Sequence, residues 1–307
     1  MTTGVDTMRA SAADRRHGEQ GAVLLVVLWI VALLAVLALG FARVSRTEAS
    51  LVRNRYAAAR AEALADTGIA LAILGLLDAG QQGDWRADGR WQTLAYGRHT
   101  VRISVQDDAG KLDVNKAPDD VLTNLFRNAG VGAQSAALVA AIDAWKDRRR
   151  ALWRGYGGAP DTFPGTVGGQ FLTLDELRRV PGMSDSIYDR VSPFLTVYSY
   201  DYRIDPLTAS ATVLRSLPGA DPAQVTAYIA ARRQVGAVPD LLPRLTGIDR
   251  FLALKPVTIV SIEAQSRSDE GARFTRDAIV ELIGTRGQPY RLLAWQQGRR
   301  SDLDDAP

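Results

Sequence analysis

Cysteine is absent from the 307-residue chain, and histidine occurs only twice, as His17 and His99. The lack of cysteine excludes disulfides and thiolate metal sites. The shortage of histidine argues against a Ser-His-Asp triad and against a histidine-rich zinc site. The net charge is only +3, so the sequence shows no strongly basic patch of the kind that binds nucleic acid. These absences indicate a protein that is not an enzyme.

Two pairs of neighbouring carboxylates resemble catalytic acids, but each has a simpler structural explanation. Asp107 and Asp108 stand at the end of an expected strand, just before Gly110, which is typical of a turn. The second pair, Asp119 and Asp120, follows a proline and opens a helix, where negative charge complements the helix dipole. No pairing of a nucleophile with a base is visible, and no glycine-rich phosphate loop is present.

The dominant feature is an uncharged run of 21 apolar residues, Ala22–Ala42. At about 1.5 Å per residue, a helix of this length matches the roughly 30 Å hydrocarbon core of a bilayer. The sequence that follows is rich in Ala, Leu, Arg and Glu, and contains no Pro or Gly before Gly68. We therefore predict one long helix over 22–79, transmembrane over 22–42 and amphipathic afterwards.

The polar residues 1–21 leave three interpretations of the amino terminus open. A secretory signal has a shorter apolar core of about 7–15 residues, although Ala38 and Gly40 form a small-residue pair suited to signal peptidase. An uncleaved anchor is the simplest alternative. In the third interpretation, cleavage after Gly21 makes Ala22 the new amino terminus.

Charges near the apolar run predict an orientation of their own. Three arginines precede the run and five follow within twenty residues. The positive-inside rule then places the carboxyl side in the cytoplasm. These later arginines alternate with acidic residues along the same predicted helix, which weakens the bias.

Strand patterns flank a helical middle. Residues 91–96 and 99–105 form an expected hairpin, and Val101, Ile103 and Val105 alternate with polar residues. Alternation and turn residues return near the carboxyl end and predict an antiparallel meander. Its strands are expected over 257–266, 272–284 and 289–298. The charged tail 299–307 is expected to be loose.

The middle of the chain contains an internal repeat. Residues 111–131 align with 203–225, and a related piece at 172–197 combines a Pro-Gly turn with two expected helices. A capping box of Thr173 and Glu176 and an Asp221-Pro222 N-cap mark helix starts. We predict two small SAM-like helical domains, at 107–198 and 199–252.

The turns of these repeats also permit a nucleic-acid interpretation. Helix-hairpin-helix modules use a second glycine to approach a phosphate, whereas Ser184 and Asp221 occupy that position here. Asp221 would repel phosphate, and no cluster of Lys or Arg flanks either turn. These features argue against phosphate binding, but the turns keep one alternative function open, which is a membrane-anchored periplasmic helix-hairpin-helix protein that binds nucleic acid.

The chain resembles the K-type minor pseudopilins of type II secretion systems. A short polar leader ends at Gly21, and the fifth residue after it is Val26, where most pseudopilins have Glu. The similarity extends to four further segments, which are Leu28-Trp29, GFARVSRTEASLVRN at 40–54, KLDVNKAP at 111–118 and the PGMS to FLTVYS segment at 181–199.

The resemblance implies an α+β fold with a long N-terminal transmembrane helix, pilin-like antiparallel strands and an inserted all-α region of two SAM-like repeats. The implied organisation is a prepilin leader (1–21), the long helix (22–79), pilin-like strands (80–106), two helical domains (107–198 and 199–252), further pilin-like strands (253–298) and a tail (299–307).

The resemblance also implies a function and a location. Prepilin peptidase would cleave between Gly21 and Ala22, with possible N-methylation of Ala22. The protein would be a single-pass inner-membrane protein with its body in the periplasm, opposite to the charge count. It would sit at the pseudopilus tip and prime assembly for export of folded proteins. Expected partners are the I- and J-type minor pseudopilins, the major pseudopilin, the peptidase and the inner-membrane assembly platform, without nucleic acid.

Members of this family can bind calcium in a loop that corresponds to 144–170 here. The weak candidate ligands are Asp143, Asp147 and Asp161. Calcium takes six to eight oxygen ligands, and arginines at 148–150 stand where the family has acids. Calcium is therefore doubtful and no cofactor is predicted with certainty; an Arg–Asp salt bridge is a hypothetical substitute.

Overall fold

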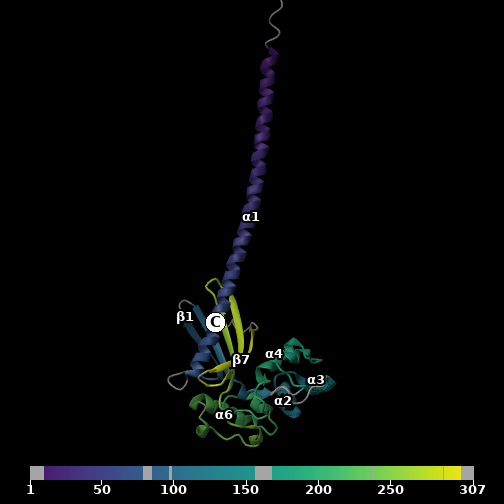
Figure 1. Cartoon of the computed structure of the whole chain (residues 1–307), viewed down its shortest axis with the longest axis vertical. Coiled ribbons are helices and arrows are strands. Elements are labelled where there is room, and N and C mark those ends of the chain that lie inside the picture. The colour runs from purple at the N-terminus through teal and green to yellow at the C-terminus, as the bar shows by residue number, and fades with distance from the viewer. Residues whose placement is uncertain are drawn as a thin grey trace, which may run out of the picture. The chain divides into compact units, whose positions relative to one another are not determined.

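The computed structural model describes most of the chain in two compact units, residues 1–60 and 61–307, which we treat separately. The described residues are 10–78, 85–96, 99–155, 168–236, 238–285 and 287–298. Helix α1, Ala10–Leu77, contributes to both units (Figure 1). It begins at Ala10, within the predicted leader, and ends at Leu77, close to the predicted end at 79, and no proline interrupts it.

The second unit contains a five-stranded sheet in the order β1-β2-β5-β6-β7, with every neighbouring pair antiparallel. Its strands are β1 (Asp88–Tyr96), β2 (His99–Asp107), β5 (Ile259–Arg267), β6 (Arg273–Leu282) and β7 (Tyr290–Gln297). Strands β2 and β5 are direct neighbours although residues 108–258 separate them in sequence. The predicted α+β fold is confirmed, and the helical region is inserted between two strands of one sheet.

The carboxyl-terminal part of α1 packs on one face of this sheet (Figure 1). The strand residues that face it alternate along β2, β5 and β6, as expected for strands with one buried face. The buried cluster comprises Leu64, Ala65, Ile69, Ala72, Ile73, Val101, Ile103, Val105, Val260, Ile262, Ala264, Ala278 and Val280. This cluster joins the two strand-rich segments on either side of the helical insertion.

Small residues on α1 allow its backbone to approach the sheet closely. Ala61, Ala65 and Ala72 are fully buried, and Gly68 lies between them. A Cβ atom at Gly68 would lie 2.7 Å from Val101 Cγ1 and 3.2 Å from Ala264 Cβ. Both distances are shorter than normal van der Waals contacts, so glycine is required for this helix–sheet spacing.

An ion pair network also joins α1 to β6. The Arg276 guanidinium donates to Asp66 Oδ1 at 2.7 Å and to Glu62 Oε1 at 2.6 Å. Its side chain also contacts the rings of Phe274 and Trp295. Arg276 is almost fully buried, and these two carboxylates raise its pKa against the opposing effect of burial. The bidentate geometry fixes the rotation of α1 about its own axis.

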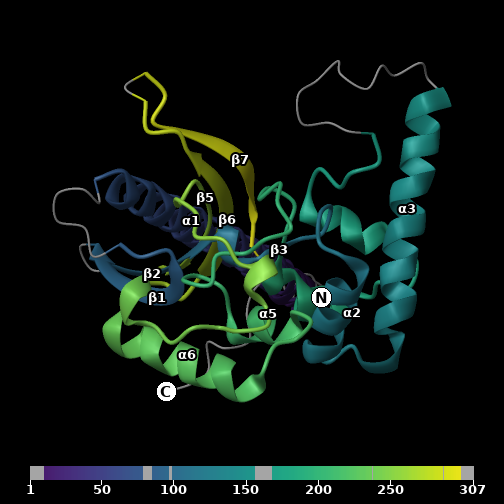
Figure 2. The same ribbon diagram turned by 90° about the horizontal axis from the view of Figure 1, so that it is seen from below.

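The inserted region contains five α-helices among its described residues (Figure 2). They are α2 (Asp119–Asn128), α3 (Ser135–Gly155), α4 (Asp185–Val191), α5 (Ala211–Ser216) and α6 (Pro222–Val235). Two short strands, β3 (Leu112–Asp113) and β4 (Leu195–Thr196), pair in parallel near the start of the region. Helix α2 packs against both α3 and α5 and is therefore central to the region.

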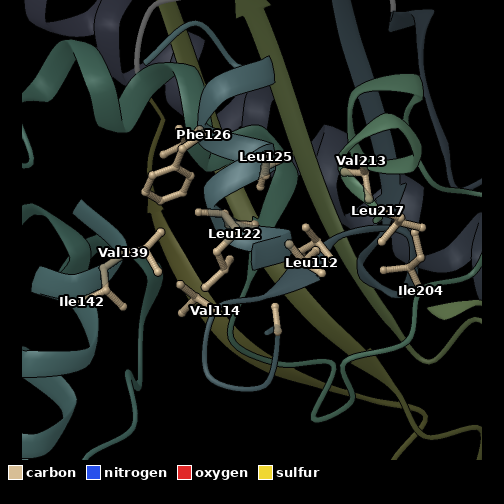
Figure 3. Packing of buried hydrophobic residues seen from close by; sticks show 14 of the residues in the cluster. Leu112, Val114, Leu122, Leu125, Phe126, Val139, Ile142, Ile204, Val213 and Leu217 are labelled. Carbon is tan, nitrogen blue, oxygen red and sulfur yellow. The ribbon is translucent and has the colours of Figure 1, made fainter. Parts of the chain in front are cut away.

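The two predicted helical domains share one hydrophobic cluster (Figure 3). Leu122 and Phe126 of α2 belong to it together with Val139 of α3, and so do Val213 and Leu217. The first three residues lie in the predicted domain 107–198 and the last two in 199–252. The division into two domains remains a prediction, but the side chains of both ranges are buried together.

Helix starts agree only partly with their predicted caps. Asp221 accepts a hydrogen bond from Ala223 N at 2.8 Å, and Pro222 opens α6 as predicted. The predicted capping box of Thr173 and Glu176 is wrong, because Thr173 makes no side-chain cap. A 3-10 helix, Leu174–Arg179, begins there instead, and the Glu176 carboxylate pairs with Arg149.

Replacing Gly68 by valine should destabilise the sheet unit by about 1–3 kcal/mol, because the new side chain overpacks a rigid contact with Val101. Chemical denaturation of the detergent-solubilised full chain measures this loss. Ala70→Val is the matched control, since Ala70 lies on the exposed face of the same helix. Equal stability of the two variants would contradict the close-packing explanation.

Candidate functional site

The first unit presents an exposed apolar helix segment. Leu24–Phe41 has a mean hydropathy of 3.0, and none of it is buried. Within the described part of the chain it is the one segment long and apolar enough to cross a membrane. Val26, which stands where most pseudopilins have Glu, lies in this segment with 58% of its surface exposed. The Gly21–Ala22 junction lies within α1, and its cleavage stays a prediction.

The three calcium candidates are not brought together. Asp143 and Asp147 both lie on α3, where they pair with Lys146 at 3.1 Å and with Arg150 at 2.7 Å. Asp161 lies outside the described residues. Among the residues that the structure does describe, no group of three His, Cys, Asp or Glu side chains is placed to hold a metal ion.

An arginine connects two segments in and after the candidate calcium loop, 144–170. Arg149 of α3 pairs with Glu176 of the following 3-10 helix, and its guanidinium lies over the Trp145 ring. Trp145 itself stacks on Phe171, with 4.2 Å between ring centroids. The hypothetical Arg–Asp salt bridge exists as the local Arg150–Asp147 pair within α3. The contact between the two segments is a different pair, Arg149 with Glu176, and an aromatic stack supports it.

The two Pro-Gly turns place their polar residues at helix starts. Ser184 Oγ accepts from Ile187 N at 3.3 Å and caps α4, while Asp221 caps α6. Beside the first turn, Arg178 pairs with three carboxylates, which are Asp175, Asp185 and Asp189. Positive charge at this turn is thus neutralised within the chain, which disfavours phosphate binding there.

The inserted region is attached to the sheet through a buried hydrogen-bond network. Asp108, only 1% exposed, accepts from Ser261 Oγ on β5 and from Thr196 Oγ1 on β4, both at 2.6 Å. Lys111 Nζ lies 2.8 Å from the same carboxylate and donates to Ser261 as well. Sequence analysis explained Asp107-Asp108 as a simple turn. The one local sign of an ion pair is Lys111, three residues after Asp108.

A second buried carboxylate positions an exposed aromatic residue. Asp113 accepts from Asn115 N and from Tyr200 N, each at 2.8 Å. Tyr200 adopts a φ of 54°, which is unfavourable for a non-glycine residue, and its side chain is 60% exposed. Local sequence gives no sign of this contact, because 87 residues separate the two partners.

Two half-buried carboxylates on the sheet face each other as well. Asp277 on β6 stands directly opposite Glu263 on β5. Burial raises the pKa of Asp277 to about 7, and the Glu263 charge adds to the increase, while Lys111 opposes it. Like charges at opposed strand positions are destabilising, so a proton on Asp277 favours the folded state at neutral pH.

The comparison with known protein families matches the region that contains Asp108. Residues 101–200 match the family model for protein K of the type II secretion system. This segment, about a third of the chain, is similar to the type II secretion protein K family. The match covers most of β2, Asp108 with its partners Lys111 and Thr196, and Tyr200, and it confirms the predicted resemblance to the K-type minor pseudopilins at the level of the family.

Solved structures and curated proteins give less. One similar chain occurs in the crystal structure of the GspK-GspI-GspJ complex from the type 2 secretion system of enterotoxigenic Escherichia coli. That chain has 16% sequence identity and a TM-score of 0.49, and the alignment covers 83% of the present chain and 99% of the other. The comparison with curated proteins finds no match.

Stability should fall as the pH rises from about 4 to 7. The folded state holds the Asp277 proton more tightly than the unfolded state, so the stabilisation is complete below the unfolded pKa and is lost as pH passes the folded pKa. Asp277→Asn should be more stable than wild type at pH 8, by on the order of 1–2 kcal/mol, and should lose part of the pH dependence.

Urea denaturation at pH 5, 6, 7 and 8 measures this dependence. Asp147→Asn is the control, because it removes the same formal charge from a carboxylate that is exposed on α3. An unchanged pH slope in Asp277→Asn, or the same gain in both variants, would contradict the assignment.

Proposed function

We propose that this protein is the tip subunit of a type II secretion pseudopilus and that it primes pseudopilus assembly for export of folded proteins across the outer membrane. The observation that carries the proposal is the protein K family match, which falls on the helical insertion and the strand that leads into it. The insertion adds about 150 residues between two neighbouring strands. A subunit with such bulk fits best where no further copy packs above it.

The apolar segment supports the same position. An ionised carboxylate inside a membrane costs several kcal/mol unless it is paired. Val26 places an apolar side chain at the fifth residue after the predicted cleavage site. This subunit therefore needs no pairing partner above it in the filament. The first-added subunit of a filament that grows from below stays at its top and has the same requirement.

The proposed partners and location follow from the family. In this proposal, prepilin peptidase removes residues 1–21 and the segment from Ala22 anchors the protein in the inner membrane, with the second unit in the periplasm. The I- and J-type minor pseudopilins would associate with it first, followed by the major pseudopilin, on the inner-membrane assembly platform. The chain would act by shape and contact, without catalysis.

Co-expression with prepilin peptidase should shorten the chain so that it begins at Ala22, as measured by intact mass and amino-terminal peptide analysis. Gly21→Leu should block cleavage, because the peptidase accepts a small residue before the scissile bond. Gly18→Leu changes a glycine elsewhere in the leader and should be cleaved normally. An uncut Met1 terminus, or a start at Phe41, would rule out the pseudopilin pathway.

The absence of cysteine allows a direct test of the tip position. Leu39→Cys introduces a single thiol on the exposed apolar segment. With cysteines at the matching positions of I- and J-type pseudopilins, oxidation in membranes should give heterodimers and no homodimer of this chain. Leu39→Ser controls for the substitution itself. Abundant homodimers would show that copies pack side by side and would exclude a single tip subunit.

A further inference from the structure

The region considered for calcium carries cations of its own on helix α3. Asp143 pairs with Lys146 at 3.1 Å, and Asp147 pairs with Arg150 at 2.7 Å. Lys146 also faces Asp119, whose pKa is raised by burial and by Asp143. A carboxylate with a positively charged partner offers little net attraction to a divalent ion, and calcium takes six to eight oxygen ligands. The described residues therefore do not fit calcium.

Arg149 brings a further positive charge to the point where α3 meets the 3-10 helix Leu174–Arg179. Its guanidinium pairs with the Glu176 carboxylate, whose side chain is only 14% exposed. The same group lies over the Trp145 ring, with 4.6 Å between its central carbon and the ring centroid. A guanidinium is planar and permanently charged, so its edge can pair with a carboxylate while its face stacks on an aromatic ring.

Phe171 extends this contact to a third segment. Its ring stacks on Trp145 with 4.2 Å between centroids and 4° between ring planes. Its backbone is held by Asn115, which donates from Nδ2 to Phe171 O at 3.0 Å and accepts from Phe171 N at 2.8 Å. Arg149, Trp145, Phe171 and Glu176 thus form one continuous cluster, which we call the guanidinium clasp.

Two glycines let the chain return along α3 to the clasp. Gly169 has a φ of 107°, and a Cβ atom there would lie 2.7 Å from Lys146 O. At Gly168, a Cβ atom would lie 2.5 Å from Trp153 Cγ. Both distances are shorter than van der Waals contact, so this segment packs directly on the helix. The clasp therefore joins the parts of the chain that precede and follow residues 156–167.

We propose that the guanidinium of Arg149 takes the structural place of a divalent cation in this chain, so that the clasp closes the helical region without calcium. In the family that the chain resembles, calcium can bind in this loop through carboxylate oxygens. Here a cation that belongs to the chain neutralises the Glu176 carboxylate and connects α3 with the segment that follows. Because this cation is covalently part of α3, the closure does not vary with the calcium concentration of the surroundings.

Thermal unfolding of the detergent-solubilised wild-type full chain tests the proposal without any substitution. The melting temperature is compared in calcium chloride, in magnesium chloride and in a chelator, with the ionic strength kept equal by sodium chloride. It should be the same in all three conditions. An increase with either divalent ion would show that the chain holds such an ion after all and would overturn the proposal.

Arg149→Gln tests the role of the guanidinium, because it removes the charge and leaves Glu176 without its counter-ion. The melting temperature should fall by about 3–6 °C, and amide hydrogen exchange over 170–179 should become faster. Arg148→Gln is the matched control, since it removes the same charge from the exposed neighbouring position. It should leave both measurements unchanged. Equal effects of the two substitutions would contradict the clasp.

A charge reversal tests the pair even if Arg149→Gln does not fold. Arg149→Glu and Glu176→Arg each place two like charges in the clasp, whereas the double variant restores an opposite pair between the same segments. The double variant should therefore melt at a higher temperature than either single variant. Additive losses in the double variant would show that the two residues act independently, which would overturn the proposal.

Discussion

The close approach between α1 and the sheet is the constraint on which the second unit depends. Ala61, Ala65 and Ala72 with Gly68 form a stripe of small residues on the buried face of α1, and the apolar rows of β2, β5 and β6 pack closely against this face. The helix buries one face of the sheet from solvent, and strands that are distant in sequence pair beneath it. Arg276 then selects one helix rotation, because only that rotation presents both acids of the turn to its guanidinium.

The same arrangement separates two kinds of surface on one sheet. The side that faces α1 is apolar and closed, whereas the opposite side carries Ser261, Glu263 and Asp277 and receives the inserted region. The insertion is attached by polar contacts, among them the Lys111–Asp108 pair, and also by apolar packing of Ile259, Ile279 and Leu293 of the sheet against its core. The polar contacts are directional and add a fixed orientation to this apolar attachment.

Local patterns in the sequence were sufficient to predict the helices and strands but not which residues would be buried between them. The alternation around Val101 and Ile103 predicted β2, and the uninterrupted helical sequence predicted α1, because both depend on neighbours within a few residues. The pairing of β2 with β5 could be anticipated only from the family layout. The turn at Asp107 and Asp108 was identified correctly as a turn, but nothing nearby in sequence shows that Thr196 and Ser261 would enclose it.

The candidate site was less accessible to sequence reasoning for the same reason. Asp143 and Asp147 were considered as ligands because they are acidic, yet their partners on α3 are cations three residues away. The salt bridge between Arg149 and Glu176 and the hydrogen bond from Tyr200 N to Asp113 each join residues far apart in sequence. Only the three arginines at 148–150, which argued against calcium, could be interpreted from the sequence alone.

The adjacency of β2 and β5 has a consequence for how the polypeptide reaches its native state. Pairing these strands closes a loop that contains residues 108–258, and the entropy cost of closing a flexible loop grows with its length. A folded insertion shortens that loop, since the Ile204–Leu252 bridge and the β3–β4 pair draw its ends together. The order of events is therefore constrained. During synthesis β2 emerges long before its partner and presents an unpaired edge until the helices condense, which makes this intermediate the stage most exposed to aggregation.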